Sequence, residues 1–312
     1  MIVEKSQLRD IPSYYKQTFQ NRFSNNISKN QILVERTEDK ITDRDIEMIQ
    51  FLAKFRFASA EQVYRMLVIK KATDIEQSSE NSIATRLDKL VKKRLVNKFM
   101  MDRDVMPEIH EDALCLYCLD YGGKLLLENY TRDESLLGWK PAEANVCSGE
   151  IISSTLGTVE VYLKVLDAVG DKLKSFNTRL FMGHDKQYVL FPFEFAIEHN
   201  MELKYFIGDS LSALEVSTKF RTKIDKYDTI LSSNAWRKYY PEDANQPMLL
   251  FFTEDMMSAE EIARMTTETG IDRFRVTTDE LMEGPLEDAF MSYKEGVLKR
   301  GKSPVFGKET LA

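Results

Sequence analysis

Asn81-Ser-Ile-Ala-Thr-Arg-Leu-Asp-Lys-Leu-Val-Lys-Lys-Arg94 combines an apolar stripe and a cationic face in one short segment. The apolar residues recur at the spacing of one side of an α-helix, which predicts a helix that packs against a core. They are Ile83, Leu87, Leu90 and Val91. The opposite side then carries polar and cationic side chains, namely Ser82, Thr85, Arg86, Lys89, Lys92 and Lys93.

Positive charge is concentrated around this helix although the whole chain is acidic. Residues 81–103 contain seven lysines and arginines against two aspartates, a local net charge of +5, whereas the 312-residue chain has a formal net charge of −7. A cationic face on an anionic protein favours focused contact with phosphates. A solvated helix face is the simpler interpretation, because most charge runs are of that kind.

The neighbouring segments predict a winged helix-turn-helix domain over residues 41–130. Two amphipathic helices, beginning at Thr42 and Ser59, precede the basic helix. Two apolar strands follow it, 95–101 and 113–119, and the polar loop between them would be the wing. Two helices, a basic third helix and a hairpin follow one another in the order of a winged helix-turn-helix domain.

The rest of the chain divides by its patterning. Residues 131–150 lack a period and predict a linker. Strands and helices alternate over 151–300, which predicts an α/β domain after the α+β winged helix. We expect residues 1–40 to be an N-terminal arm and residues 301–312 a C-terminal tail.

Composition bounds the environment of the protein. With 43% hydrophobic residues the chain can form real cores. No apolar run approaches the roughly 20 residues of a membrane helix, and the first residues lack a hydrophobic signal core, so we expect a cytoplasmic protein. Three cysteines are too few for a disulfide scaffold. Cys115 and Cys118 have the spacing of half a zinc site, but they lie in a predicted strand and are interpreted as structural residues.

Several stretches of the chain resemble the replication-relaxation proteins of plasmids and conjugative elements in Gram-positive bacteria. Ile41-Thr-Asp-Arg-Asp-Ile-Glu-Met-Ile-Gln-Phe-Leu-Ala-Lys-Phe-Arg-Phe57, with Ser59-Ala-Glu-Gln-Val63, is similar to their opening. Ala84-Thr-Arg-Leu-Asp-Lys-Leu-Val-Lys-Lys-Arg-Leu-Val96 is similar to their basic helix. The resemblance also includes Thr155-Leu-Gly-Thr-Val-Glu-Val-Tyr162 and the spacing from Lys219 to Tyr227. It covers most of the chain beyond residue 40.

This resemblance implies a winged helix that binds DNA near replication or transfer origins, followed by a domain similar to restriction-endonuclease folds. The chain departs from the family at two acidic positions. Pro192-Phe193 stands where Pro-Asp is typical, and Ile207-Gly-Asp209 stands where Glu-x-Asp is typical. The second domain is therefore expected to be degenerate as a nuclease.

A magnesium-dependent nuclease remains the alternative interpretation. Asp185, followed by Glu202 and Lys204, has the order of two carboxylates and a lysine that such sites use around Mg²⁺. Turn chemistry at Asp185 and a solvent-facing alternation at the other two residues explain the same pattern without any activity.

A second basic stretch has two open interpretations. Its cations are Lys219, Arg221, Lys223 and Lys226, which alternate with apolar residues. A half-buried helix with a cationic face is one interpretation. An extension of the DNA footprint, or a surface for an acidic partner, is the other.

We therefore predict a non-enzymatic protein that binds double-stranded DNA sequence-selectively and that belongs to a mobile element. It would act in plasmid replication, conjugative transfer or transcriptional control of those genes, without a cofactor or metal. Base contacts in the major groove are assigned to Ser82, Thr85, Arg86 and Lys89, with Arg86 reading guanine through two hydrogen bonds. Phosphate contacts are assigned to Lys92, Lys93, Lys98 and Arg103. We also expect a homodimer on repeated half-sites and contacts with replication or transfer proteins.

Overall fold

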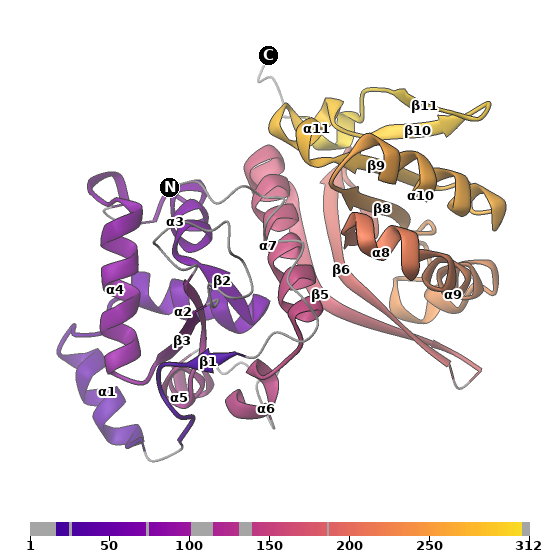
Figure 1. Ribbon diagram of the computed structural model, residues 1–312. Helices are drawn as coiled ribbons and strands as arrows, with labels where there is room; N and C mark the ends of the chain where they lie inside the picture. The colour runs from indigo at the N-terminus through magenta and orange to yellow at the C-terminus, as the bar shows by residue number, and fades with distance from the viewer. Residues whose placement is uncertain are drawn as a thin grey trace. The chain divides into compact units, whose positions relative to one another are not determined.

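The chain folds into two compact units, Met1–Val159 and Glu160–Ala312, that meet within one helix, α7 (Gly149–Val169). A computed structural model describes six stretches of it (Figure 1), which are 17–24, 27–72, 75–100, 115–130, 139–185 and 187–307. The protein is of the α+β class and contains a large mixed sheet. Among the helices in these stretches, none has the combined length and apolar character that crossing a bilayer requires.

The first unit consists of helices around a small antiparallel sheet. Its helices are α1 (Lys29–Thr37), α2 (Asp43–Phe55), α3 (Ala60–Ile69), α4 (Glu80–Lys92), α5 (Tyr121–Tyr130), α6 (Pro141–Asn145) and the start of α7. Its strands are β1 (Thr18–Phe19), β2 (Phe57–Ser59), β3 (Val96–Met100) and β4 (Cys115–Leu119), in the sheet order β1-β3-β4-β2. The chain order α2-β2-α3-α4-β3-β4 confirms the predicted helices and strand pair and adds the short strand β2.

Local hydrogen bonds explain where the helices of this unit begin. At the start of α2, the Asp45 carboxylate accepts from Thr42 N at 2.7 Å while Asp45 N donates to Thr42 Oγ1. Ser59 and Gln62 form the same reciprocal pair at the start of α3. Each pair satisfies two backbone groups that have no partner inside the helix. The N-terminal boundaries predicted for α2 and α3 are therefore confirmed.

The core of the first unit brings together residues from distant parts of the chain. Phe57, Phe99, Leu116, Cys118, Ile152 and Leu156 are all fully buried and form one cluster, against which Phe19, Phe23 and Cys147 pack. Burial raises the pKa of the Cys118 thiol well above its usual value, because the thiolate would lose its hydration. This packing agrees with a structural role for the cysteines.

The predicted domain boundaries need correction at both ends of this unit. The described part of the expected arm, residues 1–40, contains α1 and also β1, which pairs with β3. In the expected linker, residues 131–150, Asn145 Nδ2 donates to Leu119 O at 2.8 Å, so α6 belongs to the first unit. Residues 131–138 lie outside the described stretches. The unit therefore extends to Val159, because the first half of α7 completes its core.

The second unit is a seven-stranded mixed sheet in the order β11-β10-β9-β8-β7-β6-β5. Its strands are β5 (Leu173–His184), β6 (Gln187–His199), β7 (Glu202–Leu211), β8 (Met248–Thr253), β9 (Phe274–Thr278), β10 (Met291–Lys294) and β11 (Val297–Arg300). The pairs β7-β8 and β8-β9 are parallel and the other pairs are antiparallel. The helices that connect its parts are α8 (Ala213–Thr218), α9 (Phe220–Ser232), α10 (Met256–Glu268) and α11 (Asp279–Glu283).

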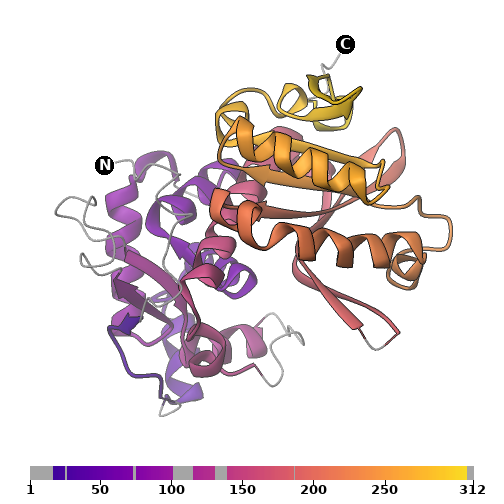
Figure 2. The same ribbon diagram turned by 45° about the vertical axis from the view of Figure 1, so that its right-hand side comes forward.

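Parallel neighbours require crossover connections, and the helices of the second unit supply them. Helices α8 and α9 connect β7 to β8, and α10 connects β8 to β9, with α9 and α10 lying along one face of the sheet (Figure 2). On that face Phe220 packs edge-on against Phe251. In the second half of α7, Tyr162 packs edge-on against Phe176 of β5. The predicted alternation is confirmed, but β5-β6-β7 is an antiparallel meander and the β10-β11 hairpin was not predicted.

The expected C-terminal tail, residues 301–312, is also corrected in its described part. Pro304–Phe306 forms a 3-10 turn, and the Phe306 ring lies 5.2 Å from the Phe206 ring between centroids. Phe306 is buried, so residues as far as Gly307 belong to the second unit. Residues 308–312 lie outside the described stretches.

Gly123 allows α5 to approach the start of β3, and this close approach can be tested. A Cβ atom at this position would lie 2.2 Å from Leu95 O and 2.5 Å from Leu119 Cδ1. We expect Gly123→Ala to lower the free energy of unfolding by about 2 kcal/mol, because backbone atoms cannot move away cheaply. Urea denaturation measures this change. Gly301→Ala is the control, because a Cβ atom there meets nothing within 4 Å, and equal stability of the two variants would contradict the argument.

Candidate nucleic-acid interface

Helix α4 buries its apolar side and exposes a polar stripe, as its sequence predicts. Ile83, Leu87, Leu90 and Val91 are each no more than 1% exposed. Ser82, Thr85, Lys89 and Lys92 are exposed, and at 100° per residue they lie along one side of the helix. The side chains that could meet a ligand are therefore separated cleanly from those that hold α4 on the unit.

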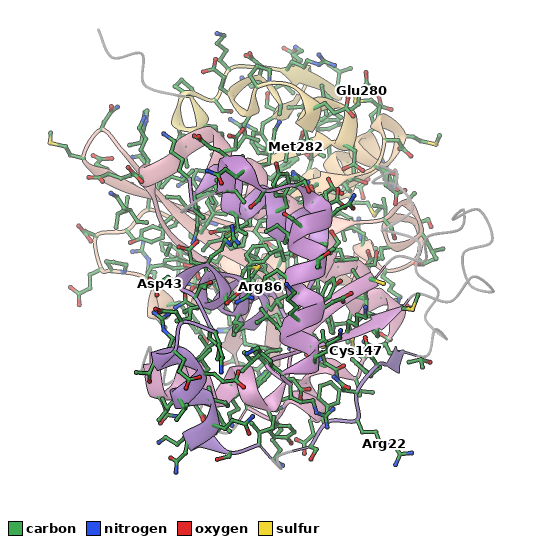
Figure 3. All side chains as sticks on the ribbon, turned by 90° about the vertical axis from the view of Figure 1, so that its left-hand side faces the viewer. Arg22, Asp43, Arg86, Cys147, Glu280 and Met282 are labelled. Carbon is green, nitrogen blue, oxygen red and sulfur yellow. The ribbon has the colours of Figure 1, made fainter. Side chains whose placement is uncertain are left out.

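Arg86 is held inside the first unit and does not belong to that exposed stripe. Its Nε donates to Asp45 Oδ1 at 2.6 Å, and its Nη2 binds Asp45 Oδ2 and donates to Lys40 O at 3.1 Å. Asp45 is completely buried. In Figure 3 the Arg86 side chain lies on the side of α4 toward the start of α2, where Asp43 is labelled. This geometry corrects the expected role of Arg86, because its Nε and Nη2 donors are already bound to Asp45 and Lys40 and are not available for a two-point contact with guanine.

Lys93 and Lys98 also have carboxylate partners. Lys93 Nζ lies 2.5 Å from Glu35 Oε2 in α1, and this contact lowers the pKa of Glu35. Lys98 Nζ lies 2.7 Å from Asp88 Oδ1 in α4. These ion pairs attach α4 to α1 and to β3, so the phosphate role predicted for both lysines would require the ion pairs to open first.

Asp88 also accepts a hydrogen bond from β4. The Tyr117 hydroxyl donates to Asp88 Oδ1 at 3.2 Å. The pKa of Tyr117 is raised, mainly by burial and then by the Asp88 charge, because both disfavour the phenolate. The Lys98–Asp88 pair is therefore part of a contact that joins α4 to both strands of the hairpin.

Lys89 and Lys92 are the cations that α4 leaves to solvent. Within the described stretches of the chain, neither lysine makes an ion pair. Thr85 Oγ1 donates to Asn81 O, and the Ser82 hydroxyl takes part in the N-terminal cap with Ser79, so both hydroxyls can still accept. Arg103 and the expected wing lie outside the described residues.

The sequence did not predict the carboxylates that form ion pairs with Arg86 and Lys93. Asp45 lies in the first turn of α2, and Glu35 lies in the segment expected to be an N-terminal arm. They lie 41 and 58 residues from their partners Arg86 and Lys93. No local pattern in one sequence connects positions so far apart, and the pairing follows only from the packing of α1 and α2 on α4.

The structure does not bring the alternative nuclease residues together. Asp185 lies in the turn between β5 and β6, whereas Glu202 begins β7 and pairs with His199 at the far end of β6. The whole of β6, Gln187–His199, separates these two turns, and its length is about 40 Å at roughly 3.3 Å per residue. Lys204 binds Glu202 itself. The prediction that Asp185, Glu202 and Lys204 surround one magnesium ion is therefore wrong, because one metal ion cannot contact both ends of this strand.

The positions where the chain departs from the resembled family are filled by apolar packing. Phe193 of β6 pairs with Gly208 of β7, and a Cβ atom on Gly208 would lie 2.6 Å from the Phe193 ring. In the described stretches, no group of three or more histidine, cysteine, aspartate or glutamate residues is placed to hold a metal ion.

Beside these apolar positions, one carboxylate lies on the opposite face of β7. Asp209 is buried, and its Oδ2 lies 2.6 Å from Lys223 Nζ and 2.9 Å from the Tyr227 hydroxyl, both in α9. Burial, followed by the Asp209 charge, raises the pKa of Tyr227. Arg221 contacts Glu268 in α10 at 2.6 Å. The second basic stretch therefore lies on a half-buried helix, and two of its cations hold neighbouring elements.

Neither the family models nor the curated proteins match this chain. The resemblance to replication-relaxation proteins therefore depends on the residue patterns alone.

The structural role of Arg86 can be tested by its removal. We expect Arg86→Ala to lower the free energy of unfolding by about 3 kcal/mol, because it leaves the Asp45 carboxylate buried without its cation. Lys89→Ala, on the same helix but exposed, should change it by less than about 0.5 kcal/mol. Chemical denaturation compares the two, and similar stability would show that the Asp45 contact does not hold α4.

Proposed function

We propose that this chain is a double-stranded-DNA-binding protein whose first unit acts as a winged helix-turn-helix domain. The order α2-β2-α3-α4-β3-β4 supports this assignment, because a winged helix-turn-helix domain has the same order: a helix, a strand, two helices and a hairpin. In such domains the last helix before the hairpin enters the major groove. Here that helix is α4, which has the exposed polar stripe.

The exposed stripe of α4 is the observation that carries the proposal. Ser82, Thr85 and Lys89 follow one another along one side, and Lys92 continues the line. Hydroxyls and ammonium groups are suited to the acceptor and donor groups of base edges. We assign base contacts to Ser82, Thr85 and Lys89 and a phosphate contact to Lys92. Arg86 instead sets the position of the helix through Asp45.

The biological role is a second step of the proposal. The resemblance of residues 41–57 and 84–96 to replication-relaxation proteins supports action at a plasmid or conjugative element, in replication, transfer or control of those genes. We further propose a homodimer on repeated half-sites, with the second unit meeting replication or transfer proteins. For that unit, the series α7, β5, β6, β7, α9 and β8 supports a fold related to restriction endonucleases.

The salt dependence of DNA binding tests the assignment of α4. We expect the double variant Lys89→Gln/Lys92→Gln to bind a duplex of arbitrary sequence more weakly. Its salt slope should be smaller by roughly two units, because on a duplex without the target site Lys89 as well as Lys92 would contact phosphates. Fluorescence anisotropy at several salt concentrations measures the slope. The contribution of phosphate contacts to binding does not depend on the DNA sequence, so the target site need not be known.

A matched control removes two lysines elsewhere. Lys238 and Lys294 are exposed and lie in the second unit, so Lys238→Gln/Lys294→Gln makes the same change in net charge. We expect its salt slope to match that of the unchanged protein. An equal loss in both double variants would show that α4 has no special role.

Incubation with supercoiled DNA and magnesium tests the non-enzymatic part of the proposal. We expect the plasmid to stay intact, because Asp185 lies at the opposite end of β6 from Glu202 and Lys204. Gel electrophoresis shows nicked or linear products directly. Cleavage that disappears in Lys204→Gln would restore the nuclease interpretation.

A further inference from the structure

A cavity opens where the parallel strands of the second unit begin. Its volume is about 310 Å³. It is lined by His199 and the first part of β7, by Asn245, Gln246 and Met248, by Arg273 and Arg275 at the start of β9, and by residues 302–306. Because β7, β8 and β9 are parallel, their N-terminal ends lie at the same edge of the sheet. This edge is used by none of the contacts proposed above for DNA.

Four cations surround this cavity, and no aspartate or glutamate lines it. They are Lys204, Arg273, Arg275 and Lys302. Lys204 binds Glu202, and Lys302 Nζ lies 3.8 Å from Glu287 Oε1. Arg273 and Arg275 have no carboxylate partner among the residues that the structure describes. The cavity therefore holds positive charge that the protein itself leaves without compensation.

The two arginines are placed to act together. Arg275 lies in β9 and Arg273 directly precedes that strand, and both side chains line the cavity. Arg275 Nη1 donates to Phe274 O at 2.7 Å, which leaves most of its donors free. Burial lowers the pKa of Arg275, because the charged guanidinium has lost part of its hydration. A bound anion would stabilise the charged guanidinium in place of the hydration that burial has removed.

The remaining wall of the cavity is apolar and aromatic. It includes Tyr205, Phe206, Met248, Pro304, Val305 and Phe306. The Phe206 and Phe306 rings are in contact, and Tyr205 packs edge-on against Tyr240 at 4.8 Å between centroids. Asn245 and Gln246 add amide groups at the border. This wall suits a flat apolar group, and the amides can set its orientation.

We propose that this cavity binds a small anion with a flat, ring-containing body. The anionic group, a phosphate or a carboxylate, would lie on Arg273 and Arg275, and the ring would lie on the aromatic wall. The volume is at the lower end of the range of small-molecule sites, roughly 300–1,000 Å³, and matches a ligand the size of a nucleoside monophosphate. The second unit is then a ligand-binding domain, whether or not the first unit binds DNA.

Calorimetric titration of the full chain tests the proposal with two charged probes and their neutral partners. Adenosine 5′-monophosphate is compared with adenosine, and indole-3-carboxylate with indole-3-carboxamide. We expect at least one anion to bind with a Kd below the millimolar range, and its neutral partner to bind at least roughly tenfold more weakly. The phosphate and the carboxylate probe distinguish the two sources of the anionic group. Absence of binding by both anions, or equal binding of the neutral partners, overturns the proposal.

Variants locate the binding. Arg273→Gln and Arg275→Gln should each weaken the bound anion roughly tenfold, and Lys302→Gln, which is more exposed, by a smaller factor. Arg300→Gln is the matched control, because this exposed arginine of β11 does not line the cavity, and its affinity should not change. Thermal unfolding shows whether each variant folds. Affinity that persists in folded Arg273→Gln overturns the proposal even if Arg275→Gln does not fold.

The proposal of a ligand site and the proposal of DNA binding can be tested separately. The double variant Lys89→Gln/Lys92→Gln should keep full affinity for the anion, and Arg273→Gln should keep the salt slope of DNA binding. Loss of anion binding in the α4 variant would place the anion on α4 and overturn the assignment to the cavity.

Discussion

The ion pair between Arg86 and Asp45 is the contact on which the first unit depends. Asp45 is fully buried and accepts hydrogen bonds from Thr42 as well as from the Arg86 guanidinium. A buried carboxylate is costly unless its charge and lone pairs are satisfied, so the arrangement is favourable only when α2 and α4 both hold their observed positions. Together with the buried apolar side of α4, this charged pair holds the helix in its observed orientation.

The distribution of charge on α4 follows from that constraint. Its sequence contains enough cations to suggest a uniformly basic face, but Arg86 and Lys93 neutralise carboxylates on α2 and α1. Lys98 of β3 in turn neutralises Asp88 of α4. These residues hold neighbouring elements in place, and they leave a narrow stripe of two hydroxyls and two lysines. A count of charges therefore overstates the cationic surface that a phosphate backbone would meet.

The second unit shows how strand geometry decides which residues can act together. An antiparallel meander of long strands carries Asp185 far from Glu202, although the two are close in sequence. The parallel strands have the opposite effect, because they bring Lys204, Arg273 and the distant segment 302–306 to one edge of the sheet. The order of Asp185 and Glu202 in the chain suggested a metal site, which the fold does not form. The fold instead assembles a cationic cavity that includes Lys204 and Arg273.

The sequence by itself determined the elements whose signals are local. The apolar spacing of Ile83, Leu87 and Leu90 predicted α4, and the capping residues at Thr42 and Ser59 predicted where α2 and α3 begin, because these signals act within a few residues. Only the tertiary structure decided the partners of Arg86 and Lys93, the completion of the first core by Ile152 and Leu156, and the cavity beside Arg273 and Arg275. Each of these joins residues that are far apart in the chain, and their proximity depends on how whole elements pack rather than on any neighbouring residue.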